Sequence, residues 1–460
     1  MTTIPPALVP PLLRHQHTDE FVAPAWSARD LRALTSLARS TERVAARVGL
    51  DERAYVESRR GTAATLRALD AEAGGGFYAV PAEAEHDQAA ADAALGGDQV
   101  VIDIQTHLVR PSLTASGAGE ALFGYLRTVD PDRWGGDIDA SLISGVAWAT
   151  NVFGLSETAV ALLTSPPGRA HENVLTNDDI ASAREIVNRY AGTGRVLAHT
   201  IVHPNLGPAE RDAMAEWSTT LQPDGWKVYT LWEPPEARGS GGWFLDDDET
   251  GGPFLDAVRA SGRTIVTSHK GLGAPIASLA PAGASPRDVG PAAAAHPDLA
   301  FVIYHSGYEM VTARDGIDDL AGGVGRLEAS LQGAGVPPGA NVYGELGSTW
   351  YLVARRPEEA AHVMGTLLRC VGEDRILWGT DSIWYGSPQS LIDAFRAFTI
   401  PERMQEVFGY PPLTDRAKDK ILSTNAAALY GVDLDAVRRP ETSTSDWLTA
   451  AQQELRDRLP

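Results

Sequence analysis

The chain has 460 residues, with 60 acidic and 39 basic side chains and a formal net charge of -21. Such an acidic protein repels phosphate backbones and anionic membrane surfaces, so we expect neither nucleic acid nor membrane partners and favour a small-molecule substrate. The single cysteine, Cys370, excludes an intrachain disulfide and a cysteine-rich zinc module, which predicts a reducing, cytoplasmic setting. Nothing in the composition decides whether the chain forms a homo-oligomer.

Residues 1–98 form an N-terminal stretch that we expect to be a helical extension. Apolar residues recur at helical spacing over 27–48 and 51–69, which predicts two or three helices. The pair His15 and His17 has a spacing seen in metal sites, but a terminal pair is more often solvated, so we expect no site there. This extension carries no chemistry that the sequence identifies.

From residue 99 the chain alternates short apolar strands with helical stretches, a pattern typical of parallel α/β architecture. Eight strands are predicted, over residues 100–107, 158–164, 195–203, 225–230, 264–269, 300–305, 341–346 and 375–381. Eight such units predict a (β/α)8 TIM-type barrel over 99–432, followed by a C-terminal helical tail over 433–460. An open doubly wound sheet would require a glycine-rich phosphate turn after the first strand, and His107 to Ser112 is not one.

Polar residues stand at the ends of four of these strands. His107, His269, His305 and Asp381 each end an apolar run, at the edge where barrel enzymes place their active sites. In an extended chain Gln105 projects to the same side as His107. Imidazole and carboxylate groups bind zinc, manganese or iron, and three or four protein ligands leave a position open for water or substrate. The pattern therefore favours metal catalysis.

The motifs around these residues resemble a known family, the amidohydrolase-related proteins of the aminocarboxymuconate-semialdehyde decarboxylase type. The opening strand, VIDIQTHL, is similar to the family's Asp-x-His-x-His strand, and SHKG and YHSG resemble the ends of its fifth and sixth strands. ILWGTDS is similar to the eighth strand's Gly-(Ser/Thr)-Asp, and ILSTNAAALYG resembles the closing helix. The resemblance covers about residues 99–432, so it includes the predicted barrel and excludes the N-terminal extension.

The resemblance implies that His107, His269 and Asp381 are metal ligands and that His305 is a catalytic residue beside the metal. One divalent metal ion is expected, with zinc as the first choice and manganese or iron as alternatives. The sequence departs from the family at Gln105, which takes the place of a first ligand that is usually histidine or glutamate. We include Gln105 among the expected ligands, although its neutral amide oxygen is a poorer donor.

Other polar and aromatic residues near the strand ends are candidates for substrate binding. Lys227 could contact substrate, serve the structure, or be carbamylated and bridge two metals as in some amidohydrolases; we assume one metal. Arg110 could bind a substrate carboxylate. Glu345 could hydrogen-bond a ligand or form an ion pair at the barrel mouth. Tryptophans after the strands either line a pocket for a flat ligand or pack loops on the barrel, and we name Trp232, Trp350 and Trp384.

The function expected from these residues is metal-dependent hydrolysis of a small amide, lactone or related C–N or C–O bond by a metal-activated water. Asp381 would accept the proton of the water and return it to the leaving group, and His305 would orient the substrate or stabilise developing charge. The first alternative is metal-dependent, non-hydrolytic decarboxylation of an aromatic or unsaturated carboxylic acid. The second is a barrel that binds a ligand without turnover, for which Gln105 is the only support.

Overall fold

The computed structural model describes residues 5–18, 21–136, 139–169, 171–272, 281–310, 323–438 and 444–460. Its centre is one parallel eight-stranded sheet in which the strands pair in the order of the chain. The strands are β1 (Val101–Thr106), β2 (Thr158–Leu163), β3 (Val196–Ile201), β4 (Gly225–Tyr229), β5 (Ile265–His269), β6 (Ala300–Tyr304), β7 (Val342–Glu345) and β8 (Ile376–Leu377). All eight predicted strands are present, each within a few residues of its predicted limits.

The first and last strands close the sheet into a barrel. The backbone N–H of Ile104 donates to the carbonyl of Trp378 at 3.1 Å, and the N–H of Asp381 donates to the carbonyl of Gln105 at 2.8 Å. A third bond joins the N–H of His107 to the carbonyl of Ser382 at 2.6 Å. These bonds continue the pairing beyond the two residues of β8, which confirms the predicted (β/α)8 architecture.

The strands are buried on both faces, because the helices cover the outside and side chains fill the interior. In β1, Val101 packs outward among the residues that face the helices, whereas Ile102 and Ile104 pack into the barrel interior. The pairing of β1 with β2 is irregular between Asp103 and Thr106. Such irregularities beside active sites change the direction in which a side chain points.

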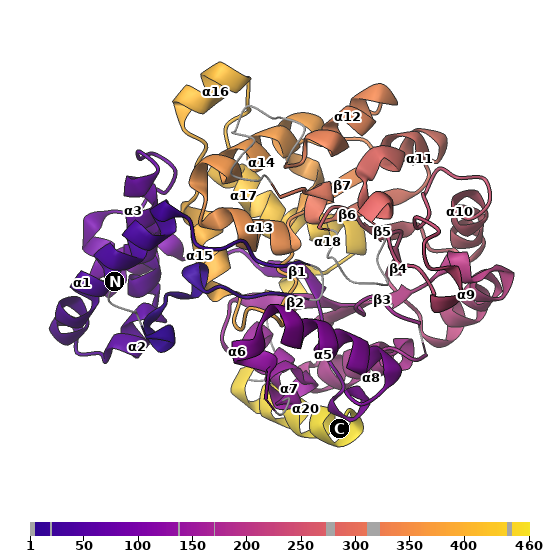
Figure 1. Cartoon of the computed structure of the whole chain (residues 1–460), viewed down its shortest axis with the longest axis horizontal. Helices are drawn as coiled ribbons and strands as arrows, with labels where there is room; N and C mark the ends of the chain where they lie inside the picture. Colours follow the sequence, from indigo (N-terminus) through magenta and orange to yellow (C-terminus); the bar gives the residue numbers. More distant parts are fainter. Residues whose placement is uncertain are drawn as a thin grey trace.

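Helices surround the barrel, and Figure 1 shows them arranged around the central strands. The longer helices after the strands are α5 (Gly117–Val129), α8 (Asn177–Ala191), α9 (Pro208–Thr220), α10 (Gly251–Ala260), α12 (Gly325–Gly333), α13 (Gly347–Ala354), α14 (Pro357–Cys370) and α15 (Gln389–Ala397). The shorter ones are α6 (Pro131–Trp134), α7 (Gly145–Ala149), α11 (Val289–Ala295) and α16 (Glu402–Phe408). The predicted helices over 176–190, 208–221, 253–261, 323–332 and 357–371 correspond to α8, α9, α10, α12 and α14.

The closing helix predicted over residues 414–430 is present with a change of winding. It consists of α17 (Asp415–Asp419), a π-helical turn at Lys420–Thr424 and α18 (Asn425–Tyr430). Ala426 and Ala427 of α18 belong to the interior cluster of Ile102, Ile104 and Leu377, so this helix packs against the barrel interior. Two C-terminal helices follow, α19 (Leu434–Arg438) and α20 (Thr444–Arg458).

The N-terminal extension forms four helices beside the barrel, α1 (Ala28–Val48), α2 (Glu52–Val56), α3 (Arg59–Glu72) and α4 (Gln88–Leu95). They gather at one end of the molecule next to α15, while α20 lies along α7 and α8 (Figure 1). Arg59 of α3 joins this lobe to the barrel through Glu157 and, at 3.2 Å, through Asp393 of α15. The domain limits at residues 98 and 432 stay predictions.

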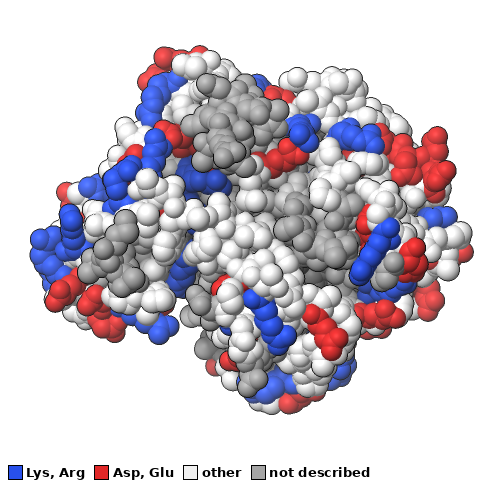
Figure 2. All heavy atoms as spheres, in the orientation of Figure 1, with Lys and Arg blue, Asp and Glu red and all other residues white. Residues whose placement is uncertain are grey.

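The surface in Figure 2 shows acidic and basic side chains interspersed around the periphery of this face. Uncharged residues predominate toward the middle of the same view. None of the helices in the described ranges is long and apolar enough to cross a membrane.

Candidate active site

Five buried polar side chains meet at the carboxyl ends of the strands, and we call them the polar layer: Gln105, His107, His269, His305 and Asp381. All five are at most 1% exposed. They come from distant parts of the sequence, because they lie in or shortly after β1, β5, β6 and β8. The layer therefore exists only in the closed barrel.

The imidazole of His107 is oriented by the strand beside it. Its Nδ1 lies 2.7 Å from the carbonyl oxygen of Thr164, which can only accept, so Nδ1 carries the proton. The lone pair on Nε2 then faces Oδ1 of Asp381 at 3.0 Å. Two acceptors at this distance require a proton or a cation between them, and a carbonyl that fixes the ring in this way is typical of a metal-binding histidine.

The amide of Gln105 lies between Asp381 and His305. Its nitrogen is 3.2 Å from Asp381 Oδ1 and 3.2 Å from His305 Nε2. Because a carboxylate only accepts, the amide group facing Asp381 is the NH2, and its second hydrogen reaches the lone pair of His305. Gln105 thus connects the two residues expected to be catalytic, while its oxygen has no hydrogen-bond partner within the described part of the chain.

The second oxygen of Asp381 accepts a hydrogen bond from the hydroxyl of Ser348, in α13. The Ser348 hydroxyl is also 2.6 Å from the hydroxyl of Tyr385, which follows β8. Ser348 is fully buried and Tyr385 nearly so. Both carboxylate oxygens of Asp381 are therefore held by named partners, and the carboxylate has little freedom to rotate.

His269 and His305 form the other side of the polar layer. Their rings meet edge to face, with centroids 4.7 Å apart. Tyr229 of β4 stacks on His269 with centroids 5.3 Å apart, and His269 Nε2 lies 3.1 Å from the carbonyl oxygen of Gly271. Since that carbonyl accepts a proton from Nε2, the lone pair of His269 lies on Nδ1.

Three residues of the site have left-handed backbone conformations: His305 at φ 59°, Ser306 at φ 52° and Asp381 at φ 57°. Residues with side chains rarely adopt this region, and each costs about 1 kcal/mol or more. Surrounding bonds hold the strained turn: the hydroxyl of Thr349 donates to the His305 carbonyl at 2.8 Å, and the hydroxyl of Ser306 donates to the carbonyl of Glu345 at 2.8 Å. Strain of this kind concentrates where geometry serves function.

Glu345 supports the turn from beneath. Its oxygens accept the backbone N–H of His305 at 2.9 Å and that of Gly347 at 2.6 Å. A Cβ on Gly379 would lie 1.8 Å from the Glu345 carboxylate, and a Cβ on Gly347 would lie 2.4 Å from the Gln105 oxygen. Burial raises the pKa of Glu345 to about 8, so the carboxyl is largely protonated at neutral pH.

The Gly-Thr-Asp motif after β8 has a separate use for each residue. Gly379 leaves room for Glu345, and Asp381 joins the polar layer. Thr380 donates its backbone N–H to Asp103 at 3.0 Å, and its hydroxyl also donates to that carboxyl. Burial raises the pKa of Asp103 to about 7 despite these bonds. Asp103 therefore ties β1 to the motif.

The donors present fit one divalent cation. His107 Nε2 and Asp381 Oδ1 converge, and the Gln105 oxygen is a buried acceptor without a partner in the described ranges. Those ranges contain no group of three or more His, Cys, Asp or Glu side chains arranged to hold a metal. Residue 105, which could supply a third such side chain at the end of β1, is a glutamine. Its amide nitrogen points toward Asp381.

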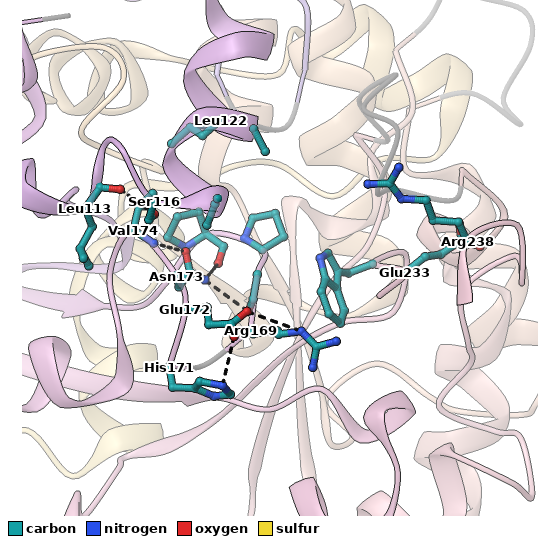
Figure 3. A pocket seen from close by; sticks show the side chains of 17 residues that line it. Leu113, Ser116, Leu122, Arg169, His171, Glu172, Asn173, Val174, Glu233 and Arg238 are labelled. Atoms are coloured by element: carbon teal, nitrogen blue, oxygen red, sulfur yellow. Dashed lines mark hydrogen bonds and ion pairs between the residues drawn. The ribbon is translucent and has the colours of Figure 1, made fainter. Parts of the chain in front are cut away.

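A pocket of about 580 Å³ lies beside the strand ends, between the segments that follow β1, β2 and β4. Leu113, Leu122 and Pro166 give it apolar walls, and Trp232 lines it as well. Figure 3 shows the side chain of Arg238 on the side away from Leu113. Thr164, whose carbonyl orients His107, lies two residues before Pro166, so one loop serves both the polar layer and the pocket.

The model of the family described as Amidohydrolase matches residues 102–432, which is most of the chain and the whole barrel. The chain belongs to the amidohydrolase family. This is the broad family that the strand-end motifs indicated. Comparison with curated proteins finds no match.

This amidohydrolase is similar to several solved structures over much of its length. The 2,6-dihydroxybenzoate decarboxylase from Rhizobium is 16% identical, with a TM-score of 0.42, over 73% of this chain and 99% of that one. A 5-carboxyvanillate decarboxylase from Novosphingobium aromaticivorans, complexed with manganese and 4-hydroxy-3-methoxy-5-nitrobenzoic acid, is 15% identical (TM-score 0.43; 73% and 96% covered). A putative 2-pyrone-4,6-dicarboxylic acid hydrolase from Pseudomonas putida is 17% identical (TM-score 0.42; 73% and 98% covered).

The amidohydrolase brings together all five residues expected to bind metal or act in catalysis, which are the polar layer itself. Of the residues expected to bind substrate, Trp232 lines the pocket. Glu345 lies beneath the polar layer, where it holds backbone N–H groups. Lys227 is buried in the barrel interior, with its Nζ 4.3 Å from the ring centre of Tyr229 and 3.7 Å from that of Tyr304.

The remaining three substrate candidates have other surroundings. Arg110 pairs with Asp179, at 3.1 Å, in the first turn of α8. Trp350 packs edge to face on Phe395 and Phe398 and donates its indole N–H to the carbonyl of Leu391. Trp384 is fully buried, and its carbonyl accepts from Arg133 at 2.9 Å. None of these three side chains is part of the pocket lining described above.

Sequence reasoning did not identify Ser348 as a site residue and did not name Tyr385 among the candidates for substrate binding. Ser348 lies in α13, an apolar helix without the periodicity that marks a surface helix. Its one signal in the sequence is its place three residues beyond Glu345, directly after a seventh strand whose end had been recognised. A search of the first helical turn after every strand would have found it.

Proposed function

We propose that this protein is a metal-dependent hydrolase that cleaves a small amide, lactone or related C–N or C–O bond. The observation that carries the proposal is the pairing of His107 Nε2 with Asp381 Oδ1 at 3.0 Å, with the histidine tautomer fixed by a backbone carbonyl. An oriented imidazole lone pair against a buried carboxylate is the arrangement that a divalent cation stabilises.

His107 and Asp381 would hold the ion, with His269 and Gln105 as the further ligands. Zinc, manganese and iron all accept such ligands. When bound, the ion supplies positive charge that polarises an oxygen of water or substrate. Side chains of the protein carry out every other part of the proposed reaction.

Asp381 is the base in this proposal. Water attacks the acyl carbon and gives its proton to Asp381, which passes that proton to the leaving nitrogen or oxygen as the acyl bond breaks. The products are a carboxylic acid and an amine or alcohol. Gln105 and Ser348 keep the carboxylate in place during both transfers, since each donates to one of its oxygens.

His305 completes the reacting centre. The Gln105 amide donates to its Nε2, so the ring is neutral with its proton on Nδ1. With its ring held by Gln105 and packed edge to face on His269, it would orient the substrate or stabilise developing negative charge. The left-handed turn at His305 and Ser306 sets this position.

Decarboxylation of an aromatic or unsaturated acid is the second candidate, and the pocket favours it. The walls are mainly apolar, with Trp232 among them, and the exposed Arg238 makes no ion pair within the described ranges. An apolar site destabilises a carboxylate, and that charge is removed once CO2 has left and the carbon has taken up a proton. The carbon–carboxylate bond would break, CO2 would leave, and Asp381 or His305 would protonate the carbon.

A cytoplasmic setting belongs to the same proposal. Cys370 is buried in α14, and burial raises the pKa of its thiol to about 12, so the thiol is protonated at neutral pH. The protein would then act on a small metabolite in a reducing compartment.

Two measurements test the function. The metal content of the purified protein is determined, and metal-loaded protein is assayed with a panel of carboxylic acids for CO2 release and with amides and lactones for hydrolysis. Hydrolysis of an amide or lactone supports the leading proposal, whereas CO2 release without hydrolysis would replace it with the second. Metal binding without turnover of any compound would favour a ligand-binding barrel.

A further inference from the structure

The N-terminal segment contacts the helix that carries Ser348. The hydroxyl of Tyr351 in α13 donates to the carbonyl of Arg14 at 2.6 Å and accepts the backbone N–H of Gln16 at 3.3 Å. Arg355, at the end of the same helix, donates to the carbonyl of Pro24 at 3.0 Å. Arg14, Gln16 and Pro24 all precede the part of the chain that matches the family.

This segment is packed rather than loosely attached. Leu12, Leu13 and Phe21 are at most 2% exposed, and His17 is 5% exposed. His17 Nδ1 accepts the backbone N–H of Ala23 at 3.0 Å, so the expectation of a solvated histidine pair is wrong for His17. Apolar packing on the barrel explains the burial of this histidine and lowers its pKa.

A continuous set of contacts leads from the segment to Asp381. The ring of Tyr351 stacks face to face on Tyr385, with centroids 3.8 Å apart and planes 13° apart. The hydroxyl of Tyr385 is 2.6 Å from that of Ser348, which donates to Asp381. Tyr351, Tyr385 and Ser348 are all at most 6% exposed, so water does not substitute for these contacts.

We propose that the N-terminal segment is a positioning element of the active site. Its backbone anchors the hydroxyl of Tyr351, Tyr351 holds the ring of Tyr385, and Tyr385 with Ser348 fixes the carboxylate of Asp381. The proposal rests on the proposed role of Asp381, and it assigns a function to residues outside the family's barrel. Tyr351, Tyr385 and Ser348 act through Asp381 and do not themselves react.

The test is a double-mutant cycle with Tyr351→Phe and Ser348→Ala, read by manganese affinity in calorimetry. Ser348→Ala should weaken manganese binding about tenfold, the loss expected for one hydrogen bond to a charged acceptor. Tyr351→Phe should weaken it about threefold, because stacking on Tyr385 remains. The double variant should bind like Ser348→Ala alone, since the first change acts through the second residue.

The matched control is Tyr55→Phe. The Tyr55 hydroxyl donates to the carbonyl of Glu85 at 3.0 Å inside the N-terminal lobe, so its loss should leave manganese affinity unchanged. Thermal unfolding of each variant checks that the fold is intact. Additive effects of Tyr351→Phe and Ser348→Ala would overturn the proposal, as would unchanged affinity in both single variants.

Crystal structures of wild type, Tyr351→Phe and Ser348→Ala separate this proposal from the proposed function. If wild type binds neither manganese nor zinc nor iron, the metal-dependent function fails, and the orientation of the Asp381 side chain still decides the positioning role. We expect a rotated or disordered Asp381 carboxylate in both variants. The wild-type orientation in both would overturn the positioning role whatever the reaction.

Discussion

The polar layer and the pocket beside it are built in opposite ways. In the polar layer each side chain is held by a named hydrogen bond or ring contact, and two of its five residues, His305 and Asp381, have a strained backbone. The pocket has mainly apolar walls, and Arg238 at its edge is exposed. The difference teaches that the polar layer tolerates little change in geometry, whereas the walls of the pocket can vary. In the proposed function the polar layer would carry out the reaction and the pocket would select the substrate by its shape.

The largest expected effect is that of Asp381→Asn. The variant removes the ligand charge and the proton acceptor with almost no change in volume, so turnover of the substrate found by screening should fall by about 10³-fold or more. The fold should persist, as measured by circular dichroism. Asp256→Asn, at an exposed position of α10, is the control. Wild-type turnover in metal-loaded Asp381→Asn would refute the mechanism.

His305→Ala separates catalysis from metal binding inside the polar layer. Turnover should fall by about 10² to 10³-fold, the usual loss for a general acid–base or charge-stabilising group, while bound metal stays near the wild-type amount. Metal content by mass spectrometry and turnover of the same sample provide the two readouts. Loss of metal together with activity would make His305 a ligand.

The ring centroid of His203 lies 4.1 Å from that of Trp232, which lines the pocket. We expect the protonation of His203 to change the stability of the protein. Burial lowers its pKa to about 4, so below the unfolded value of 6.5 the unfolded chain binds a proton that the folded chain excludes. The contribution of His203 to the free energy of unfolding is fully present above pH 6.5. It falls by roughly 3 kcal/mol as the pH is lowered toward 4.

His203→Gln should therefore lose less stability than wild type between pH 7.5 and pH 4.5, as measured by urea unfolding at each pH. Its loss should be smaller by about 2 to 3 kcal/mol. His171→Gln is the control, since that side chain is 73% exposed. An equal loss in His203→Gln and wild type would show that His203 is not responsible.

Gln105→His tests whether residue 105 is a ligand of the metal. Imidazole is a better donor to zinc than an amide oxygen, so zinc affinity in a competitive chelator titration should rise about tenfold or more. Activity need not rise, because the new ring cannot donate to both Asp381 and His305 as the amide does. Unchanged affinity would place residue 105 outside the metal's ligands.

Trp232→Ala tests the pocket alone and should have the mildest effect. KM should rise about tenfold through lost apolar contact, with kcat within about threefold of wild type, because Trp232 is not among the partners of the polar layer. Val407→Ala, at a position 73% exposed, is the control. A fall in kcat with unchanged KM would move Trp232 from recognition to catalysis.

Strand positions and the polar layer could be read from the sequence because both leave local signals. Apolar runs of five to eight residues mark buried strands, and a polar residue at the end of such a run is placed by the barrel's geometry. His107, His269, His305 and Asp381 were found in this way. The irregularity in β1 and the amide orientation of Gln105 were not predictable, since both depend on neighbouring strands.

Residues whose partners lie far along the chain were harder to place. Trp350 was expected either to line a pocket or to pack a loop on the barrel. α13 begins directly after β7, and its helical spacing turns Trp350 toward Phe395 and Phe398. Arg110 was expected to meet a carboxylate, and it meets Asp179 of α8. In both cases the residue type was informative, but the helix beside it decided the partner.

The seam between β1 and β8 has a consequence for how activity arises during synthesis. Gln105 and Asp381 are 276 positions apart, so the ribosome must release nearly the whole barrel before they can meet. Contacts this distant form slowly, and we expect catalytic competence to appear only after the last strand has docked. We also expect the contacts between β1 and β8 to be lost early when the protein is heated or its chain is cut. Activity would then disappear while most secondary structure remains.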